Sequence, residues 1–88
     1  MLVYDFTNQF KKDFKLMKKR GKDLDKIIDV IVSLIWDEPL PARCHEHKLH
    51  GDWVGFTECH IEGDCVIMYV IEEEKITFAY TGTHSDYL

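Results

Sequence analysis

The sequence predicts an α+β fold in which two antiparallel helices pack on one mostly antiparallel sheet. Apolar residues recur at helical spacing through the first 36 residues, whereas three runs rich in β-branched and aromatic residues follow in the last 35. Strand-like and helix-like segments that are separated along the chain in this way are typical of the α+β class. With 88 residues the chain is long enough for one small domain, which we place over residues 1–88.

The N-terminal segment predicts a short strand followed by a helix. The apolar residues 2–4 are typical of a strand. Thr7 or Asn8 can cap a helix, which we expect to run to about Arg20. Large apolar side chains at spacings of four, four and three residues share one stripe of that helix: Phe6, Phe10, Phe14 and Met17. This stripe predicts the face that packs into the core.

A second helix is predicted after a tight turn. Gly21 is a residue type that often ends helices, and Asp23 is a good cap for the next one. The apolar positions then follow at i, i+3, i+4, i+7, i+10 and i+11, namely Leu24, Ile27, Ile28, Ile31, Leu34 and Ile35. Because the turn is so short, we expect the two helices to pack antiparallel.

The remaining chain predicts a long loop and then three antiparallel strands. Residues 37–52 contain two prolines and no periodicity, and a loop of this length in a small domain is often functional. The three strand-like runs lie at 54–62, 65–71 and 76–81. Gly63 and Asp64 join the first two runs as a hairpin, and the acidic turn 72–75 joins the last two.

Composition and charge limit the possible classes of function. No apolar run approaches the roughly 20 residues of a membrane span, and the N-terminus lacks the layout of a secretory signal. The three cysteines, Cys44, Cys59 and Cys65, are an odd number and a poor basis for a disulfide framework. We therefore expect free thiols and a cytoplasmic protein. The net charge is −5, although residues 11–22 hold seven of the eleven cations, so a polyanion can bind only locally.

All five histidines lie in the acidic second half of the chain. Histidine titrates near neutral pH, so two histidines can act as base and acid in one reaction. Cleavage of RNA through attack by its own 2′-hydroxyl needs both roles and requires no metal or cofactor. We expect His47, His60 and His84 to converge at one end of the sheet, with Asp64 orienting one of them.

Other interpretations of these residues stay open. His60 can be a satisfied histidine at a sheet edge, and we interpret His45 and His50 as surface residues without a role. Zinc-type ligands are also present, namely Cys44, His45, His47, Cys59, His60 and Cys65. They contain no C-x₂-C or H-x₃-H pair, and alternation places Cys59 on the apolar face of its strand, opposite His60. The pattern therefore disfavours both a zinc site and a cysteine nucleophile.

Two motifs in the second half are specific. The chain contains the run HKLHGDWVGFTECHIEGD, with the spacing H-x-L-x-G-x-W-x-G-[FY]-x-[DE]-x-H-[IV]-x-x-D, and it closes on TGTHSDYL with a G-[TS]-H. With the order of elements, these motifs resemble the YafQ branch of the RelE superfamily, which comprises small bacterial toxins of type II toxin–antitoxin pairs. The resemblance covers nearly the whole chain and implies a RelE-like β-α-α-β-β-β fold.

The resemblance also implies an activity and partners. Members of this branch are mRNA interferases, endoribonucleases that cut mRNA in the decoding site of the 70S ribosome and so inhibit translation. They are neutralised by a DinJ-like antitoxin that represses the shared operon, so contact with DNA is expected only through the antitoxin. No cofactor, metal or membrane is implied.

The catalytic residues of the family fall on His47, His60, Asp64 and His84 of this chain. We interpret His84 and His47 as the acid–base pair. His60 and Asp64 are expected to position the phosphate or to shift the pKa of a neighbouring catalytic residue. The chain departs from the family where relatives carry two arginines, because Tyr80 and Thr57 occupy those positions. Losing a charge contact to a reacting phosphate can cost about 10²-fold or more in rate. Lys48, Arg43 or a protonated histidine can partly replace it.

A further set of residues is expected to contact RNA or the ribosome: Lys11, Lys12, Lys15, Lys18, Lys19, Arg20, Lys22, Lys48, Tyr80 and Tyr87. A solvated lysine face that only confers solubility explains the basic stretch equally well. The missing arginines keep a second function open, in which a weakly active or inactive toxin-fold module mainly binds its antitoxin and takes part in operon autoregulation.

Overall fold

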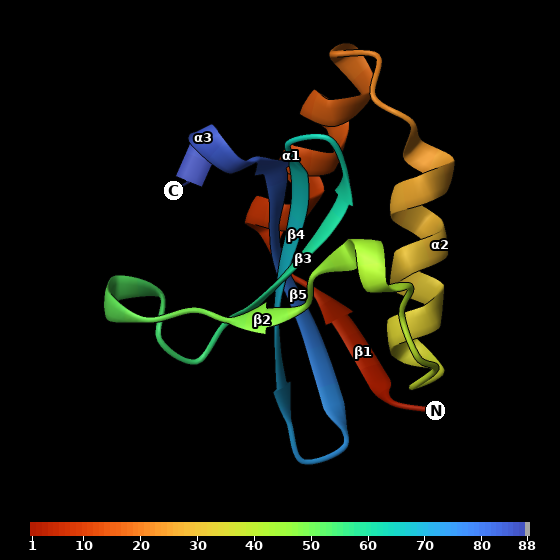
Figure 1. Ribbon diagram of the computed structural model, residues 1–88, viewed down its shortest axis with the longest axis vertical. Coiled ribbons are helices and arrows are strands. Elements are labelled where there is room, and N and C mark those ends of the chain that lie inside the picture. Colours follow the sequence, from red (N-terminus) through yellow and green to blue (C-terminus); the bar gives the residue numbers. More distant parts are fainter. Residues whose placement is uncertain (88) are drawn as a thin grey trace.

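The computed structural model describes residues 1–87, with Tyr87 described by its backbone alone (Figure 1). The helices and strands are β1 (Val3–Phe6), α1 (Asn8–Lys19), α2 (Leu24–Ile35), β2 (His47–Lys48), β3 (Thr57–Glu62), β4 (Cys65–Glu72), β5 (Lys75–Thr83) and α3 (His84–Tyr87), with two 3₁₀ turns, η1 (Ala42–Cys44) and η2 (Gly51–Trp53). The sheet order is β1-β5-β4-β3-β2, and every neighbouring pair is antiparallel except β1 with β5. The predicted α+β class, two helices on one mostly antiparallel sheet, is confirmed.

The helices start where the sequence predicts, because the capping side chains are in place. Thr7 Oγ1 accepts a hydrogen bond from the Phe10 N–H (3.0 Å), and Asp23 Oδ1 accepts one from the Lys26 N–H (3.3 Å). Gly21 reverses the chain between the helices with a φ of +75°, a conformation that glycine adopts at little cost. Within the described residues, none of the helices is long and apolar enough to span a membrane.

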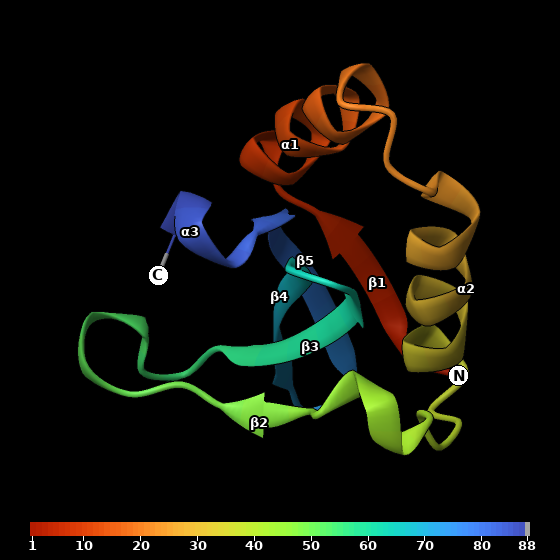
Figure 2. The same ribbon diagram turned by 45° about the horizontal axis from the view of Figure 1, so that its top comes forward.

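Each helix has its own main contact with the sheet. Helix α1 packs against β5 and α2 against β3. In Figure 2 α1 lies at the top of the view and α2 at its right, with β1 between them. The core lies between the helices and the sheet, where Met17, Ile27, Ile67 and Phe78 are fully buried. Most large apolar side chains of both helical stripes therefore fill the core, as the spacing predicts. The prediction is wrong for Ile28, whose side chain is 43% exposed.

Two polar contacts fasten α1 to β5. Thr7 Oγ1 donates to the Ala79 carbonyl (2.7 Å), and the Thr81 N–H donates to the buried carboxylate of Asp13 (3.2 Å). The sheet register shifts between Met68 and Tyr69, opposite Ala79, which locally disrupts the ladder of backbone bonds. Side chains from α1 thus supply polar partners beside this irregularity.

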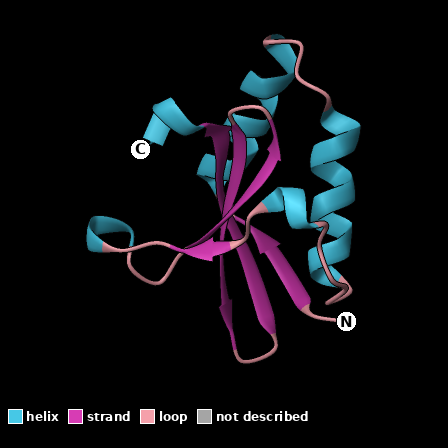
Figure 3. Ribbon diagram, in the orientation of Figure 1, coloured by secondary structure: helices cyan, strands magenta, loops and turns pink. Residues whose placement is uncertain are grey.

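The segment between α2 and β3 differs most from the sequence-based prediction (Figure 3). The region predicted as loop contains β2 and both 3₁₀ turns, and β3 begins at Thr57 rather than at residue 54. Gly55 has a φ of +94°, which breaks the extended conformation that the apolar run predicted. Strand β2 has only two residues, too few for a recognisable alternation of side chains.

The register of the sheet divides its residues into two faces. Cys59 pairs with Ile67, and both belong to the core beneath the helices. Side chains alternate along a strand, so Glu58 and His60 lie on the opposite face. Glu58 forms a row with Met68 and Tyr80 across three strands on that face. Figures 1 and 2 place α3 and the loop between β2 and β3 on the side away from α2.

Replacing Thr7 with alanine should lower the free energy of unfolding by about 1–3 kcal/mol. The cap contributes about 1 kcal/mol, and the hydrogen bond to the Ala79 carbonyl adds about 1 kcal/mol. Urea denaturation followed by circular dichroism measures the difference. Asp23→Ala is the matched control, because it removes a cap without a second bond to the sheet. Equal losses for the two variants would mean that the bond to Ala79 contributes nothing.

Candidate active site

The rings of three other histidines lie around His60, near the sheet edge formed by β3 and β2. The ring centroids of His45 and His47 each lie 6.0 Å from that of His60, and the ring of His84 lies 6.2 Å from it. His60 belongs to β3, His47 to β2 and His84 to the first position of α3. The structure thus brings together the three histidines that we expected to converge, and it adds His45.

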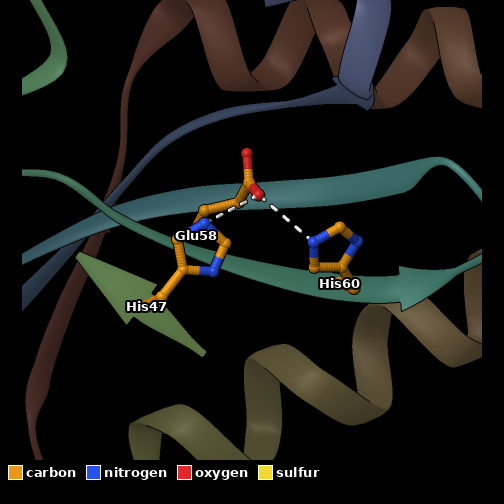
Figure 4. A group of neighbouring side chains, drawn as sticks. All are labelled: His47, Glu58 and His60. Atoms are coloured by element: carbon orange, nitrogen blue, oxygen red, sulfur yellow. Dashed lines mark ion pairs between the residues drawn. The ribbon is translucent and has the colours of Figure 1, made fainter. Parts of the chain in front are cut away.

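A buried carboxylate lies among these rings (Figure 4). Glu58 is fully buried, and its Oε1 lies 3.3 Å from His47 Nε2 and 3.2 Å from His60 Nε2. The sheet produces this arrangement directly, because Glu58 is the cross-strand partner of His47 and lies two residues before His60 on the same face. Neither of its two oxygens accepts a hydrogen bond within the described part of the chain.

The orientation of the His47 ring is set by a backbone carbonyl. Its Nδ1–H donates to the carbonyl oxygen of His45 (2.7 Å), so Nε2 faces Glu58 and is protonated only when the ring is charged. The contact with Glu58 is therefore attractive when His47 is an imidazolium, when the carboxyl carries the proton, or when a metal ion lies between the atoms. His45 has a left-handed backbone (φ 45°), which is uncommon for a residue other than glycine.

Asp64 reaches His84 through the backbone. Its carbonyl oxygen accepts a hydrogen bond from the His84 N–H (2.7 Å), while its carboxylate pairs with Lys22 at 3.7 Å. The carboxylate thus faces the turn after α1. The hairpin turn that ends β3 therefore holds the segment that carries His84.

His47, Glu58 and His60 also form a set of possible metal ligands. This set differs from the cysteine and histidine ligands considered from the sequence. One ligand atom each from His47, Glu58 and His60 lies within 4.8 Å of the others. The Nδ1 bond of His47 to a carbonyl is the usual support of a metal-binding imidazole. These side chains fit a transition-metal ion such as copper or zinc, for which imidazole is a suitable ligand.

The cysteines contribute to the core rather than to this cluster. Cys44, Cys59 and Cys65 are free and buried, as expected from their odd number and from the alternation in β3. Burial raises the pKa of the Cys65 thiol to about 11 and raises the pKa of the Cys59 thiol as well. The thiols are therefore protonated near neutral pH, which disfavours a cysteine nucleophile.

The residues expected to contact RNA fall into separate groups. Exposed lysines follow one another along α1, namely Lys11, Lys12, Lys15, Lys18 and Lys19. Arg20 and Lys22 at the end of that helix form ion pairs within the protein, with Asp86 (2.8 Å) and Asp64 (3.7 Å). Lys48 is exposed beside the histidine cluster, as the cross-strand partner of Thr57. It thus neighbours Thr57, one of the two positions where the family resemblance led us to expect an arginine.

Tyr80, at the other position where an arginine was expected, belongs to an aromatic cluster. Its ring centroid lies 5.2 Å from that of Trp53 and 5.9 Å from that of Phe56. It is half-buried on the sheet face that carries Glu58. Tyr87 belongs to α3, and its side chain lies outside the described structure.

Two members of the cluster were missed from the sequence. Glu58 was given no role, although it fills the acidic position of the spaced motif, which was the available signal. His45 was interpreted as a surface residue, and no local pattern predicts its position. Its ring reaches His60 because η1 and the left-handed turn at His45 precede β2.

Comparison with known proteins identifies relatives of the whole chain. The family described as "Bacterial toxin of type II toxin-antitoxin system, YafQ" matches residues 2–88. The mRNA interferase toxin YafQ of Escherichia coli strain K12 is 37% identical over 82 residues, which cover 92% of this chain and 89% of that protein.

Solved structures agree with this match. The toxin in a crystal structure of the E. coli DinJ–YafQ complex superposes with a TM-score of 0.92 and 34% identity, covering 100% of this chain and 99% of that one. A copper-bound mutant toxin from Helicobacter pylori superposes with a TM-score of 0.92 and 32% identity, covering all of both chains. The chain belongs to the YafQ family of toxins of bacterial type II toxin–antitoxin systems.

Proposed function

We propose that this protein is the toxin of a type II pair and acts as an mRNA endoribonuclease on the ribosome. The observation that carries the proposal is the group of histidines around the buried Glu58 on the face not covered by α1 and α2. The E. coli relative is named an mRNA interferase toxin, which agrees with a nuclease. The exposed lysines of α1 suit contact with ribosomal RNA, since they add local positive charge to an acidic protein.

In the proposed reaction one histidine accepts the proton of a 2′-hydroxyl while another protonates the departing 5′ oxygen. We assign these roles to His84 and His47. They lie on different sides of His60, which is on β3. His47 is on the neighbouring strand β2, whereas His84 follows β5, which lies beyond β4 on the other side. A phosphate near His60 would then contact both. In their imidazolium forms His47 and His60, which lie beside the Glu58 carboxylate, would supply positive charge to the phosphate.

The charge from these histidines bears on the missing arginines. With Tyr80 and Thr57 at the two family positions, positive charge near the phosphate must come from imidazolium groups and from Lys48 beside Thr57. Weak cleavage, with antitoxin binding as the main role, is the alternative function that this composition favours. The same cleavage measurement separates the two functions.

His84→Ala should reduce cleavage by at least about 10²-fold, because it removes one of two proton-transfer groups. A short message translated by purified ribosomes, with cut sites mapped by primer extension, measures the rate. His50→Ala is the matched control, because this exposed histidine lies outside the cluster around His60. Codon-specific cuts that persist in His84→Ala would contradict its role. A native protein that makes no cuts but binds its antitoxin would favour the alternative function.

An apolar groove between the helices supports the antitoxin as a partner. It has a volume of about 480 Å³ and is lined by Phe6, Phe10, Lys11, Phe14, Lys15, Ile28 and Ile31. On α2 it continues into Val32 and Trp36, which lie four and eight residues after Ile28 and are exposed. Such a groove fits one apolar face of an amphipathic helix, and the two lysines favour a helix with acidic flanks. The DinJ–YafQ complexes agree with an antitoxin of the DinJ type.

Ile28→Asp should weaken binding of a DinJ-like antitoxin by tenfold or more. Ile28 is 43% exposed, so the change removes an apolar contact from the groove without emptying the core. Titration calorimetry with the purified pair measures the affinity. Val54→Asp, at a 72% exposed position in the loop before β3, is the control and should bind normally. Equal affinities for both variants would place the antitoxin elsewhere.

A second candidate function is binding of a copper ion by His47, Glu58 and His60. The convergence of three donor atoms within 4.8 Å favours it, and a relative has been crystallised with copper bound. A bound ion would occupy the imidazole nitrogens that the proposed proton transfer requires. Metal binding and cleavage would therefore exclude each other at this cluster.

Copper(II) should bind with a stoichiometry of one and suppress cleavage in proportion to occupancy. Electron paramagnetic resonance reports nitrogen coordination, and the ribosome assay reports the rate. His47→Ala should lose the high-affinity site because it removes one of three ligands, whereas His50→Ala should retain it. Unchanged copper affinity in His47→Ala would exclude the cluster as the site.

A further inference from the structure

The short helix that carries His84 is capped at its start by the side chain of its own third residue. Thr83, His84, Ser85 and Asp86 follow in the chain, and Asp86 Oδ2 accepts a hydrogen bond from the Thr83 N–H (2.8 Å). Helix α3 has only four residues, and a helix of this length is not stable by itself. Its geometry therefore depends on contacts with the rest of the protein.

One of these contacts comes from the end of α1. Arg20 is the C-terminal cap of that helix. Its two terminal guanidinium nitrogens donate hydrogen bonds to the two carboxylate oxygens of Asp86, at 2.8 and 3.4 Å. A bidentate pair of this kind fixes direction as well as distance. The two residues are 66 positions apart in the sequence, so the pair connects α1 directly to the start of α3.

A second contact holds His84 from the other side. The His84 N–H donates to the Asp64 carbonyl (2.7 Å) in the turn between β3 and β4. Lys22, two residues after Arg20, pairs with the Asp64 carboxylate at 3.7 Å. The turn after α1 thus supplies one cation to each of the two segments that border His84.

We propose that Arg20 and Asp86 are positioning residues that hold His84 against His60. This proposal rests on the proposed nuclease function. In this proposal Arg20 orders a segment of the protein itself and does not contact ribosomal RNA. The rings of His60 and His84 lie 6.2 Å apart, and a shift of about 1 Å in such a group can cost about 10²-fold in rate.

The pair keeps its charge over the range in which histidine titrates. Arg20, together with the Thr83 N–H, lowers the pKa of the Asp86 carboxyl from 3.8 to about 2. A lowered carboxyl pKa means that the interaction is complete above about pH 4 and is lost only as the pH falls through about 2. The ion pair that supports His84 is therefore intact near neutral pH.

Arg20→Gln should lower kcat for ribosome-programmed cleavage by about tenfold to a hundredfold with KM unchanged. Asp86→Asn should lower it at least as much, since it weakens the bonds to Arg20 and to the Thr83 N–H. The double variant should be no worse than Asp86→Asn alone, because the two residues act as one unit. Arg20→Lys should restore part of the rate. Exposed ion pairs contribute little to overall stability, so these variants should fold.

Hydrogen exchange of the His84 amide gives a readout that does not depend on cleavage. It should be faster in Arg20→Gln and unchanged in the control Lys75→Gln, which breaks an exposed ion pair with Asp5 far from His84 in the sheet. Unchanged exchange in Arg20→Gln would overturn the proposal, and so would a raised KM with normal kcat, the result expected if Arg20 gripped RNA. A native protein without cleavage would contradict the proposed function, while the exchange rates would still decide whether Arg20 orders His84.

Discussion

A buried carboxylate is the constraint on which the site depends. Glu58 is fully enclosed, and an ionised carboxylate at such a position costs several kcal/mol unless positive charge lies beside it. Its nearest partners are the Nε2 atoms of His47 and His60. The two imidazoles can supply that charge only by holding protons or a metal ion. A single acidic residue thus couples His47 of β2 to His60 of β3.

The backbone makes this coupling possible with few residues. Strand β2 has only two residues, yet its pairing with β3 sets His47 directly across from Glu58. The period of two along β3 then brings His60 to the same face. The carbonyl of His45, in a left-handed turn, selects the ring nitrogen of His47 that faces the carboxylate. Each position therefore follows from the register and hydrogen bonds of the main chain.

The charged residues in and after α1 fall into two groups, those paired within the protein and those exposed to solvent. At the end of the sheet near His84, carboxylates are paired with cations from the turn after α1 and from the start of α2: Arg20 with Asp86, Lys22 with Asp64 and Lys26 with Glu62. The remaining lysines of α1 are exposed and form a local positive surface on an acidic protein. The same helix buries Phe10 and Met17 beneath it. One helix therefore carries core contacts, internal ion pairs and a surface suited to a polyanion.

The sequence by itself determined the fold class, both long helices, the three long strands and the histidines that belong together. Caps at Thr7 and Asp23 and the apolar stripes act locally, and the spaced motif of the second half indicated the family. Only the tertiary structure decided the role of Glu58, the contact of His45 with His60 and the ion pair of Arg20. These depend on strand register and on residues up to 66 positions apart, which no local pattern encodes. A charge in a sequence does not show its partner, because burial and pairing arise only when distant segments pack.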